Sequence, residues 1–531
     1  MKMKRLISAF LVIVTCLSLM VGCQKEQPKV DPENLTGLDR VAWEIAQPYM
    51  NMNLEPINDG NPVTIKVHLG SIMPTLSSVA TPEQPDVFNS TEILRKAFQY
   101  IYPNVTIEWA RTVDTSDADS LLQYLTTQLS SKTAPDIIFA FGSSFADRNW
   151  LYDFRDSMDQ PNVFIEGNTA WKDQFPSYLF AHWSVSDARD NVVGVPLSCA
   201  AGTSTGLFYN KEIFNNLQLD TPKTWEELIT VTKTLKDNGY VGFAPWGGPG
   251  SGNRKPTTQV WDVQMSLGPF YAEYQKDKID YNGDGLQSQA EKLRAAYEGY
   301  YFVEGNPYVM DMWRQVKRKY TECLEVGYEN TDYESKWLLG KVGILEDGLW
   351  RYPEEVSNTE REYEFGIVPP PVIDQTTSQY VNQPEYTEVG PYRPVPSETY
   401  SILLPSVEAH GGDAVLDACV KFLQFLTVPD NNNMIVLEQK GKAIGFQKES
   451  EIPQELSEYF NQSFPKVPTF DWPGGFTRSG SEKMSIMLEM WVKGQLTDAE
   501  FAQKFDEEFK KDIDEFIKNM GIDVTGWTKG Y

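Results

Sequence analysis

The sequence predicts an α/β fold, because segments with strand periodicity and segments with helix periodicity alternate along most of the chain. One strand–helix–strand–helix–strand series begins at Pro62, and a second alternating series begins after Val192. Alternation of this kind is typical of sheets with parallel strands. Residues 23–531 are also enough for two domains with separate cores.

The first series opens with the strand "PVTIKVHLG", in which Val63, Ile65 and Val67 share one face. The helix "STEILRKAFQYIY", the strand "NVTIEW" and the helix "DADSLLQYLTTQLSS" follow. The last strand, "PDIIFAFG" from Pro135, is a continuous apolar run, as expected for a strand buried on both faces. We therefore expect a parallel sheet covered by helices.

The second series contains strand-like segments in "NVVGVPLS", "TGLFYN", "GYVGFAPW", "GKVGILEDGLW" and "ETYSILLPS". A capping box, Thr224 with Glu227, opens a helix that we expect to end near Gly239. A second capping box, Thr497 with Glu500, opens the last helix. Further helices are expected at 291–301, at 310–325 and in "DAVLDACVKFLQFLTVP".

The first 22 residues predict export. Lys2, Lys4 and Arg5 precede an apolar run that is too short to span a bilayer comfortably, as in a secretory signal. The end of this segment, "MVGC", resembles a bacterial lipobox, which implies cleavage before Cys23 and attachment of lipid to that cysteine. The alternative is an ordinary secreted protein with a chance cysteine. Residues 23–60, which begin "CQKEQPKVDPENLTG", are expected to form a tether.

The charge and the cysteines exclude several classes of partner and site. Removal of the signal takes three positive residues from a chain of net charge −27, which leaves about −30. A charge of this sign argues against nucleic acid as a partner. The remaining Cys199, Cys323 and Cys419 are far apart and odd in number, so we expect buried apolar residues rather than disulfides.

The segment "DYNGDGLQSQAE", 280–291, fits the twelve-residue calcium loop D-x-[DN]-x-[DN]-G-x5-E. Gly285 would make the sharp turn of such a loop. A second loop of this kind is absent from the sequence, so a paired calcium sensor is not expected. We predict a structural Ca2+ site outside the cell, with a solvated turn as the alternative. The expected ligands are Asp280, Asn282, Asp284, the carbonyl of Leu286 and Glu291.

Five segments, in this order, resemble the sugar-binding type of extracellular solute-binding protein. The first two are "PDIIFAFGSSF" and "VVGVPLSCAAGTSTGLFYNKEIFNNLQLDTPKTWEELI". The others are "WLLGKVGILEDGLW", "DACVKFLQFLTVPDNNNMIVLEQKG" and "MWVKGQLTDAEFAQKF". Together they reach across nearly the whole chain after the predicted signal.

The resemblance implies a two-lobed, periplasmic-binding-protein-like (type II) α/β fold with a hinge and an interlobe cleft. Lobe one is expected at 61–200 plus 401–450, and lobe two at 203–398 plus 455–520. Receptors of this family hand a solute to an ABC importer and do not convert it. The resemblance and the lipid signal together imply a monomer anchored to the outer face of the cytoplasmic membrane of a Gram-positive bacterium.

The ligand expected from the resemblance is a carbohydrate, because pyranose rings stack on aromatic side chains and need polar partners around their rim. Trp246, Trp350 and Trp472 follow strands or lie in loops, where open α/β sheets bind ligands. The length of the chain and its calcium loop look like those of the larger oligosaccharide receptors. We therefore expect an oligosaccharide.

Polar candidates come from matching positions in sugar-binding relatives. The match to the segment after "PDIIF" gives Phe141, Ser143 and Ser144, and the match near the first crossing gives Thr203, where relatives carry an acid. The loop after the first strand adds one more polar side chain, and two charged residues flank Trp350. These three candidates are Ser71, Asp347 and Arg351.

Three alternatives remain open. The receptor could bind a peptide or another non-sugar solute, or the same fold could serve an adhesin or a sensor-coupled receptor. "GTSTG" fits the G-x-S-x-G of serine hydrolases, with Ser204 as nucleophile and His410 as base. The strand-like "LFYN" that follows Ser204 argues against a hydrolase, because a nucleophile elbow leads into a helix.

Overall fold

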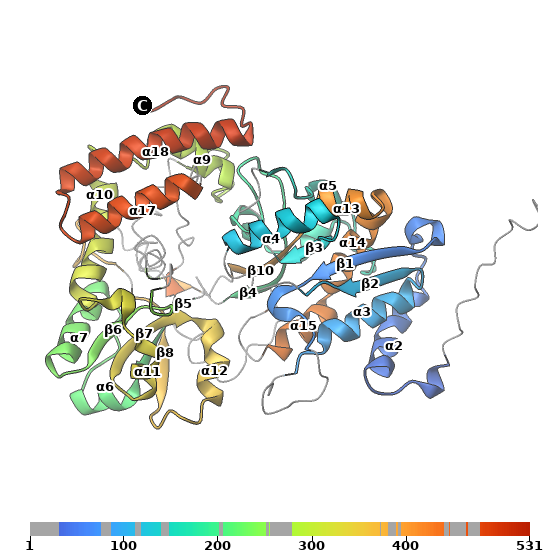
Figure 1. The fold of residues 1–531 in the computed structure, drawn as a ribbon, viewed down its shortest axis with the longest axis horizontal. Coiled ribbons are helices and arrows are strands. Elements are labelled where there is room, and N and C mark those ends of the chain that lie inside the picture. Colours follow the sequence, from blue (N-terminus) through green and yellow to red (C-terminus); the bar gives the residue numbers. More distant parts are fainter. Residues whose placement is uncertain are drawn as a thin grey trace, which may run out of the picture.

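The computed structural model contains two lobes, each built on its own sheet, and the chain passes between them more than once (Figure 1). This arrangement confirms the predicted two-lobed α/β fold. The structure describes residues 31–75, 87–111, 118–139, 148–200, 205–250, 254, 279–371, 373–380, 389–390, 395–439, 445, 464–465 and 478–531.

Lobe one contains a five-stranded sheet in the order β2-β1-β3-β10-β4. β1 is parallel to β2 and β3, as predicted. β10 is antiparallel to β3 and β4, so the prediction of a parallel sheet is wrong for this strand, which enters lobe one from lobe two. The strands are β1 (Val63–His68), β2 (Val105–Trp109), β3 (Ile137–Phe139), β4 (Val195–Ala200) and β10 (Val395–Ile402).

The helices of lobe one enclose a core in which Leu94, Phe98 and Phe422 are fully buried. Cys419 is a buried free thiol in this core, and Cys323 is buried and free in lobe two, as expected for apolar packing. The helices are α2 (Gly37–Met50), α3 (Ser90–Ile101), α4 (Ala118–Ser131), α5 (Arg155–Met158), α13 (Leu404–His410), α14 (Asp413–Leu426) and α15 (Pro429–Glu438).

Helix α2 lies inside the range 23–60 that we predicted as a tether. Its Trp43 meets Tyr100 of α3 edge-on, with ring centroids 5.2 Å apart. Ala42 and Ala46 of the same helix are completely buried. The predicted tether is therefore too long, because the small residues on one face of α2 let this helix pack on the lobe.

Lobe two contains a four-stranded sheet in the order β6-β7-β5-β8. β6 and β7 are parallel, whereas β5 is antiparallel to β7 and β8. The strands are β5 (Thr205–Asn210), β6 (Val241–Ala244), β7 (Val342–Gly348) and β8 (Phe365–Val368). The short strands β9 (Val389–Gly390) and β11 (Phe464–Pro465) form a separate antiparallel pair.

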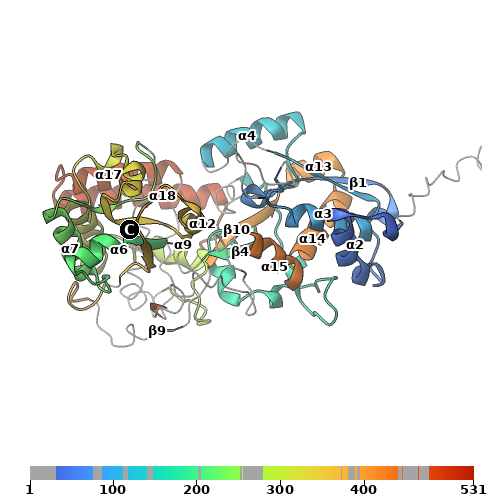
Figure 2. The ribbon, with the colours of Figure 1, turned by 90° about the horizontal axis from the view of Figure 1, so that it is seen from below.

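Both predicted capping boxes open helices of lobe two, at Thr224 for α7 and at Thr497 for α18. α17 and α18 lie side by side over this lobe (Figures 1 and 2). Trp491 of α17 stacks on Phe501 of α18, with ring centroids 4.3 Å apart. The helices are α6 (Lys211–Leu217), α7 (Trp225–Asp237), α9 (Gln289–Tyr297), α10 (Pro307–Arg318), α11 (Tyr333–Leu338), α12 (Tyr352–Ser357), α17 (Arg478–Val492) and α18 (Asp498–Met520).

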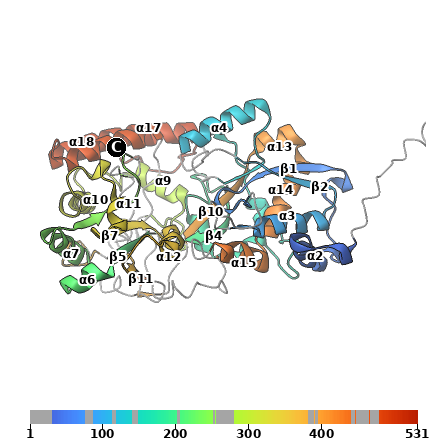
Figure 3. The same ribbon diagram turned by 60° about the horizontal axis from the view of Figure 1, so that its bottom comes forward.

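The strands β4 and β10 mark two places where the chain crosses between the lobes. In Figure 3, β4 and β10 lie between the helices of the two lobes, so the chain leaves lobe one after β4 and returns at β10. β10 begins at Val395, a few residues before the predicted return at 401. Among the described helices, none combines the length and apolar composition needed to span a bilayer.

Candidate functional site

Two of the predicted ligand-binding tryptophans meet at the carboxyl ends of neighbouring strands. β6 and β7 are parallel, with Ala244 opposite Leu345, so the segments that follow these strands leave the same edge of the sheet. The rings of Trp246 and Trp350 are therefore neighbours, with centroids 6.2 Å apart and planes inclined by 70°. An edge-to-face pair of this kind presents two aromatic surfaces at a wide angle.

The backbone beside Trp350 leaves space for the ring only because residue 348 is glycine. A Cβ on Gly348 would lie 2.3 Å from the Trp350 indole, a distance that no real contact allows. Gly348 ends β7, and the 3-10 turn Leu349–Arg351 follows immediately. The glycine thus lets the indole fold back against its own strand.

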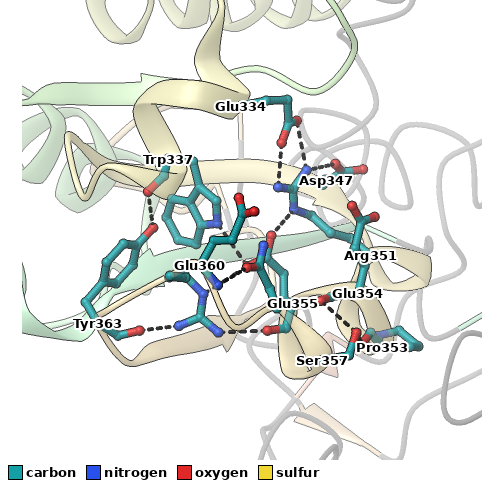
Figure 4. A network of polar contacts seen from close by, with 12 residues as sticks. Glu334, Trp337, Asp347, Arg351, Pro353, Glu354, Glu355, Ser357, Glu360 and Tyr363 are labelled. Carbon is teal, nitrogen blue, oxygen red and sulfur yellow. Dashed lines mark hydrogen bonds and ion pairs between the residues drawn. The ribbon is translucent and has the colours of Figure 1, made fainter. Parts of the chain in front are cut away.

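Asp347 and Arg351, predicted to reach a ligand, lie in a buried polar network (Figure 4). The Arg351 guanidinium contacts both carboxylate oxygens of Glu334 of α11, with N···O distances of 2.9 and 2.7 Å. It also donates to Glu355 of α12 at 2.6 Å and to Asp347 at 3.1 Å. The indole N–H of Trp337 donates to the second Glu355 oxygen at 3.0 Å.

Burial dominates the ionisation of Asp347. It raises the pKa of this carboxyl to about 6, although Arg351 and the Gly348 amide favour the charged form. Burial lowers the pKa of Arg351, but its three carboxylate partners together outweigh burial and raise this pKa, so the arginine stays charged. The predicted contact of these two residues with a ligand stays a prediction.

The predicted residues of lobe one can be placed only in part. Ser71 is exposed in the 3-10 turn Gly70–Ile72, directly after β1. The other residues predicted to contact a ligand lie outside the described residues, and so does Cys23, the predicted site of lipid attachment. These ligand candidates are Phe141, Ser143, Ser144, Thr203 and Trp472. Their roles stay predictions.

Two features of the site were missed by the sequence analysis. In lobe one, a Cβ on Gly70 would lie 2.9 Å from the ring of Phe139, so the ends of β1 and β3 approach very closely. In lobe two, Arg254 is buried and donates to the carbonyl of Gly247 at 2.8 Å, beside Trp246. A lone arginine in a Gly-rich segment gave no signal for this contact.

The segment predicted as a calcium loop contains two glycines with positive φ. Gly283 and Gly285, at positions 4 and 6, have φ values of +75° and +80°. Asp280 accepts hydrogen bonds from both of their amides, at 2.7 and 2.9 Å. Glu291 folds back over the loop and accepts from the amides of Tyr281 and Ser288, at 2.8 and 2.9 Å.

The loop side chains are arranged around backbone amides rather than around a common centre. Within the part of the chain that the structure describes, no three His, Cys, Asp or Glu side chains are grouped so that they could hold a metal ion. The loop donors are nevertheless oxygens throughout, which is the chemistry that calcium requires. The calcium site stays a prediction.

The family model for the bacterial extracellular solute-binding proteins matches residues 88–433, which is more than half of the chain. The chain belongs to this family. Its members bind solutes outside the cytoplasm and do not convert them, so this solute-binding protein is not an enzyme. A comparison with curated proteins gives no significant match.

Solved structures with the same fold support the two-lobed architecture. A chitin oligosaccharide binding protein superposes with a TM-score of 0.56 at 16% identity, over 85% of this chain and 99% of its own. The acarbose-binding GacH receptor of Streptomyces glaucescens gives 0.53 at 14% identity, over 86% and 99%. A tagatose-bound ABC transporter solute-binding protein of Thermotoga lettingae gives 0.52 at 17%, over 85% and 100%.

The structure argues against the serine-hydrolase alternative, because both ring nitrogens of His410, its predicted base, contact groups of lobe one. Nδ1 of His410 lies 2.7 Å from an oxygen of the buried Asp136, and Nε2 lies 3.0 Å from the carbonyl of Lys132. These contacts hold α13 at the amino end of β3, in lobe one. Ser204 lies outside the described residues, and β5 of lobe two begins directly after it.

Proposed function

We propose that this solute-binding protein captures a carbohydrate, specifically an oligosaccharide, between its lobes and delivers it to the membrane subunits of an ABC importer. The observation that carries the proposal is the pair formed by Trp246 and Trp350 at the carboxyl edge of the lobe-two sheet. The C–H faces of a sugar ring pack against indole surfaces, and ligands of open α/β sheets bind at this edge.

The ligands named for structural neighbours support this class of solute. One neighbour is named for chitin oligosaccharide, and another was solved with acarbose. At identities below 20% these neighbours show the fold but not the ligand specificity of this chain. A peptide or another non-sugar solute is therefore the second candidate, and the experiment below distinguishes the two.

We also propose that Cys23 carries lipid and holds the receptor at the outer face of the cytoplasmic membrane of a Gram-positive cell. The basis is the charged start, the short apolar run and the cysteine that ends "MVGC". Each buried CH2 of an acyl chain adds roughly 0.8 kcal/mol to membrane affinity. Detergent partitioning of wild type and Cys23→Ala, followed by mass spectrometry, tests the anchor: an unmodified Cys23 would exclude it.

The test of the ligand class is a thermal-melting screen of the chain from residue 31 onward against neutral gluco-, xylo- and chito-oligosaccharides and a peptide library. One glycan class is expected to raise the melting temperature by several degrees, with no product formed. Trp350→Ala should abolish this shift, and Trp43→Phe, on the outer helix α2, should retain it. A shift with peptides alone would contradict the sugar assignment.

We further propose that Ca2+ binds Asp280, Asn282, Asp284, the Leu286 carbonyl and Glu291, and so ties the loop to the start of α9. A free calcium concentration ten times the Kd would stabilise lobe two by about 1.4 kcal/mol. Glu291→Gln is the sharp variant, because glutamine can keep the capping box that Glu291 forms with Ser288 but cannot supply a bidentate carboxylate. Calcium should raise the melting temperature of wild type but not of this variant; no rise in wild type contradicts the site.

A further inference from the structure

Trp246 and Trp350 are both connected, through a neighbouring segment or residue, to the segment 328–338, which contains α11. Trp350 is tied to it through the next residue in the chain, Arg351, and Trp246 is tied to it through Arg254. Neither arginine is a neighbour of α11 in the sequence. The arrangement therefore fixes two rings from different strands relative to a common support.

Arg351 has little capacity left for a ligand. Its guanidinium carries five N–H donors, and its contacts with Glu334, Glu355 and Asp347 use four of them. Its side chain is only 8% exposed, whereas that of Glu334 is 48% exposed. Figure 4 shows Arg351 pointing into this group of carboxylates. These contacts connect the turn that carries Trp350 to α11 and α12.

Arg254 performs the same task for the segment after β6. Its Nε donates to the Gly247 carbonyl at 2.8 Å, and Nη1 donates to the carbonyls of Tyr328 and Thr331, both at 2.6 Å. Its guanidinium also lies over the Tyr333 ring, 4.9 Å from the centroid. The Gly247 carbonyl, adjacent to Trp246, is thereby bound to the start of α11.

The stability of the fold does not by itself account for this network, because replacing a buried ion pair by apolar residues often leaves a fold as stable as before. The directional contacts of the network point instead to a role in geometry. Bidentate arginine–carboxylate contacts are the most directional of these.

We propose that Arg254, Arg351 and Glu334 are positioning residues that set the angle between the Trp246 and Trp350 rings, and through it the shape of sugar that the receptor accepts. The part of this inference that concerns sugar specificity rests on the proposed function. The part that concerns the angle between the rings does not, because this angle can be measured without any ligand.

The first test is circular dichroism in the far ultraviolet, where two indoles this close give an exciton couplet. The couplet is the difference between the spectra of wild type and Trp246→Phe. Glu334→Gln and Arg351→Lys should each reduce it by more than half, because each removes the bidentate contact. Glu354→Gln is the matched control: it removes an exposed carboxylate from the same α12 turn without touching Arg351, and should leave the couplet unchanged.

Glu334→Gln is expected to fold, because Asp347 and Glu355 still neutralise Arg351; Arg254→Lys provides an independent variant at the other anchor. Absence of a couplet in wild type, or an unchanged couplet in all three variants, overturns the inference. The second test is the affinity for the glycan that gives the largest melting shift, which Glu334→Gln should weaken roughly tenfold. If no glycan binds wild type, the proposed function fails, while the couplet still decides whether α11 positions the rings.

Discussion

The ionisation of Asp347 is expected to make lobe two less stable as the pH rises. Burial raises its pKa in the folded protein to about 6, above the usual value of 3.8, so the folded state holds the proton more tightly than the unfolded state. Stability from this group is complete below about pH 4 and is lost as the pH rises through about 6. Two units of pKa correspond to a loss of up to about 3 kcal/mol.

Chemical denaturation of wild type and Asp347→Asn between pH 4 and pH 7 measures this effect. The variant has no ionisable group at this position, so the free energy of unfolding of wild type relative to the variant should fall over this interval. A constant difference across the interval would show that Arg351 and the Gly348 amide compensate fully for burial.

Side chains in the site differ in how far the sequence predicts them. The placement of Trp246 and Trp350 at the ends of strands was predictable, because each follows a strand-like segment in the sequence, and their contact with a ligand stays a prediction. The roles of Arg254 and Glu334 were not, because a guanidinium bound to backbone carbonyls, or to an acid on a distant helix, leaves no local pattern. Asp347 and Arg351 were singled out for their position, but their burial and mutual contact could not be predicted from it.

The packing of α17 against α18 depends on a single glycine. A Cβ on Gly480 of α17 would lie 2.0–2.2 Å from the three carboxyl atoms of Asp512 of α18, a side chain that is only 3% exposed. Inside an isolated helix, alanine would be about 1 kcal/mol more favourable than glycine. At position 480 the clash with the buried Asp512 carboxylate makes alanine less favourable than glycine.

Gly480→Ala is therefore expected to destabilise lobe two by about 2–4 kcal/mol, since the two helices must separate or Asp512 must leave its site. Thermal or chemical denaturation measures the loss, and Ser479→Ala, at the exposed neighbouring position, serves as the control. Equal stability of wild type and Gly480→Ala would mean that the helices separate at no cost.

Helix and strand positions were predictable wherever local chemistry marks an end. The capping boxes at Thr224 and Thr497 open α7 and α18 where predicted, because serine, threonine and glutamate satisfy amides that the helix leaves unpaired. The π-helical turn Lys319–Cys323 that follows α10 has no such marker. The direction of β10 was also not predictable, since it depends on which lobe the chain comes from.

The relative arrangement of the lobes is set in part by contacts that join α9 to lobe one. The side-chain amide of Gln289 donates to the carbonyl of Ala181 at 2.9 Å. Asp190 accepts hydrogen bonds from the Ser288 hydroxyl and from the backbone N–H of Ala290. Local periodicity predicted each lobe but not this contact, whose two sides lie about a hundred residues apart. The contact involves the last part of the proposed calcium loop, because Ser288 and Gln289 lie within 280–291.

Loss of this contact is expected to loosen the lobes. Asp190 places a carboxylate at the α9 amino terminus, where negative charge is favourable. Asp190→Asn combined with Gln289→Ala removes both this charge and the hydrogen bond from Gln289 to Ala181. Small-angle X-ray scattering of the unliganded double variant should show a larger radius of gyration and a broader distance distribution than wild type. Asp156→Asn, which removes an exposed charge from α5 of lobe one, should scatter like wild type. Identical curves for the double variant and wild type would show that the chain crossings alone hold the lobes in place.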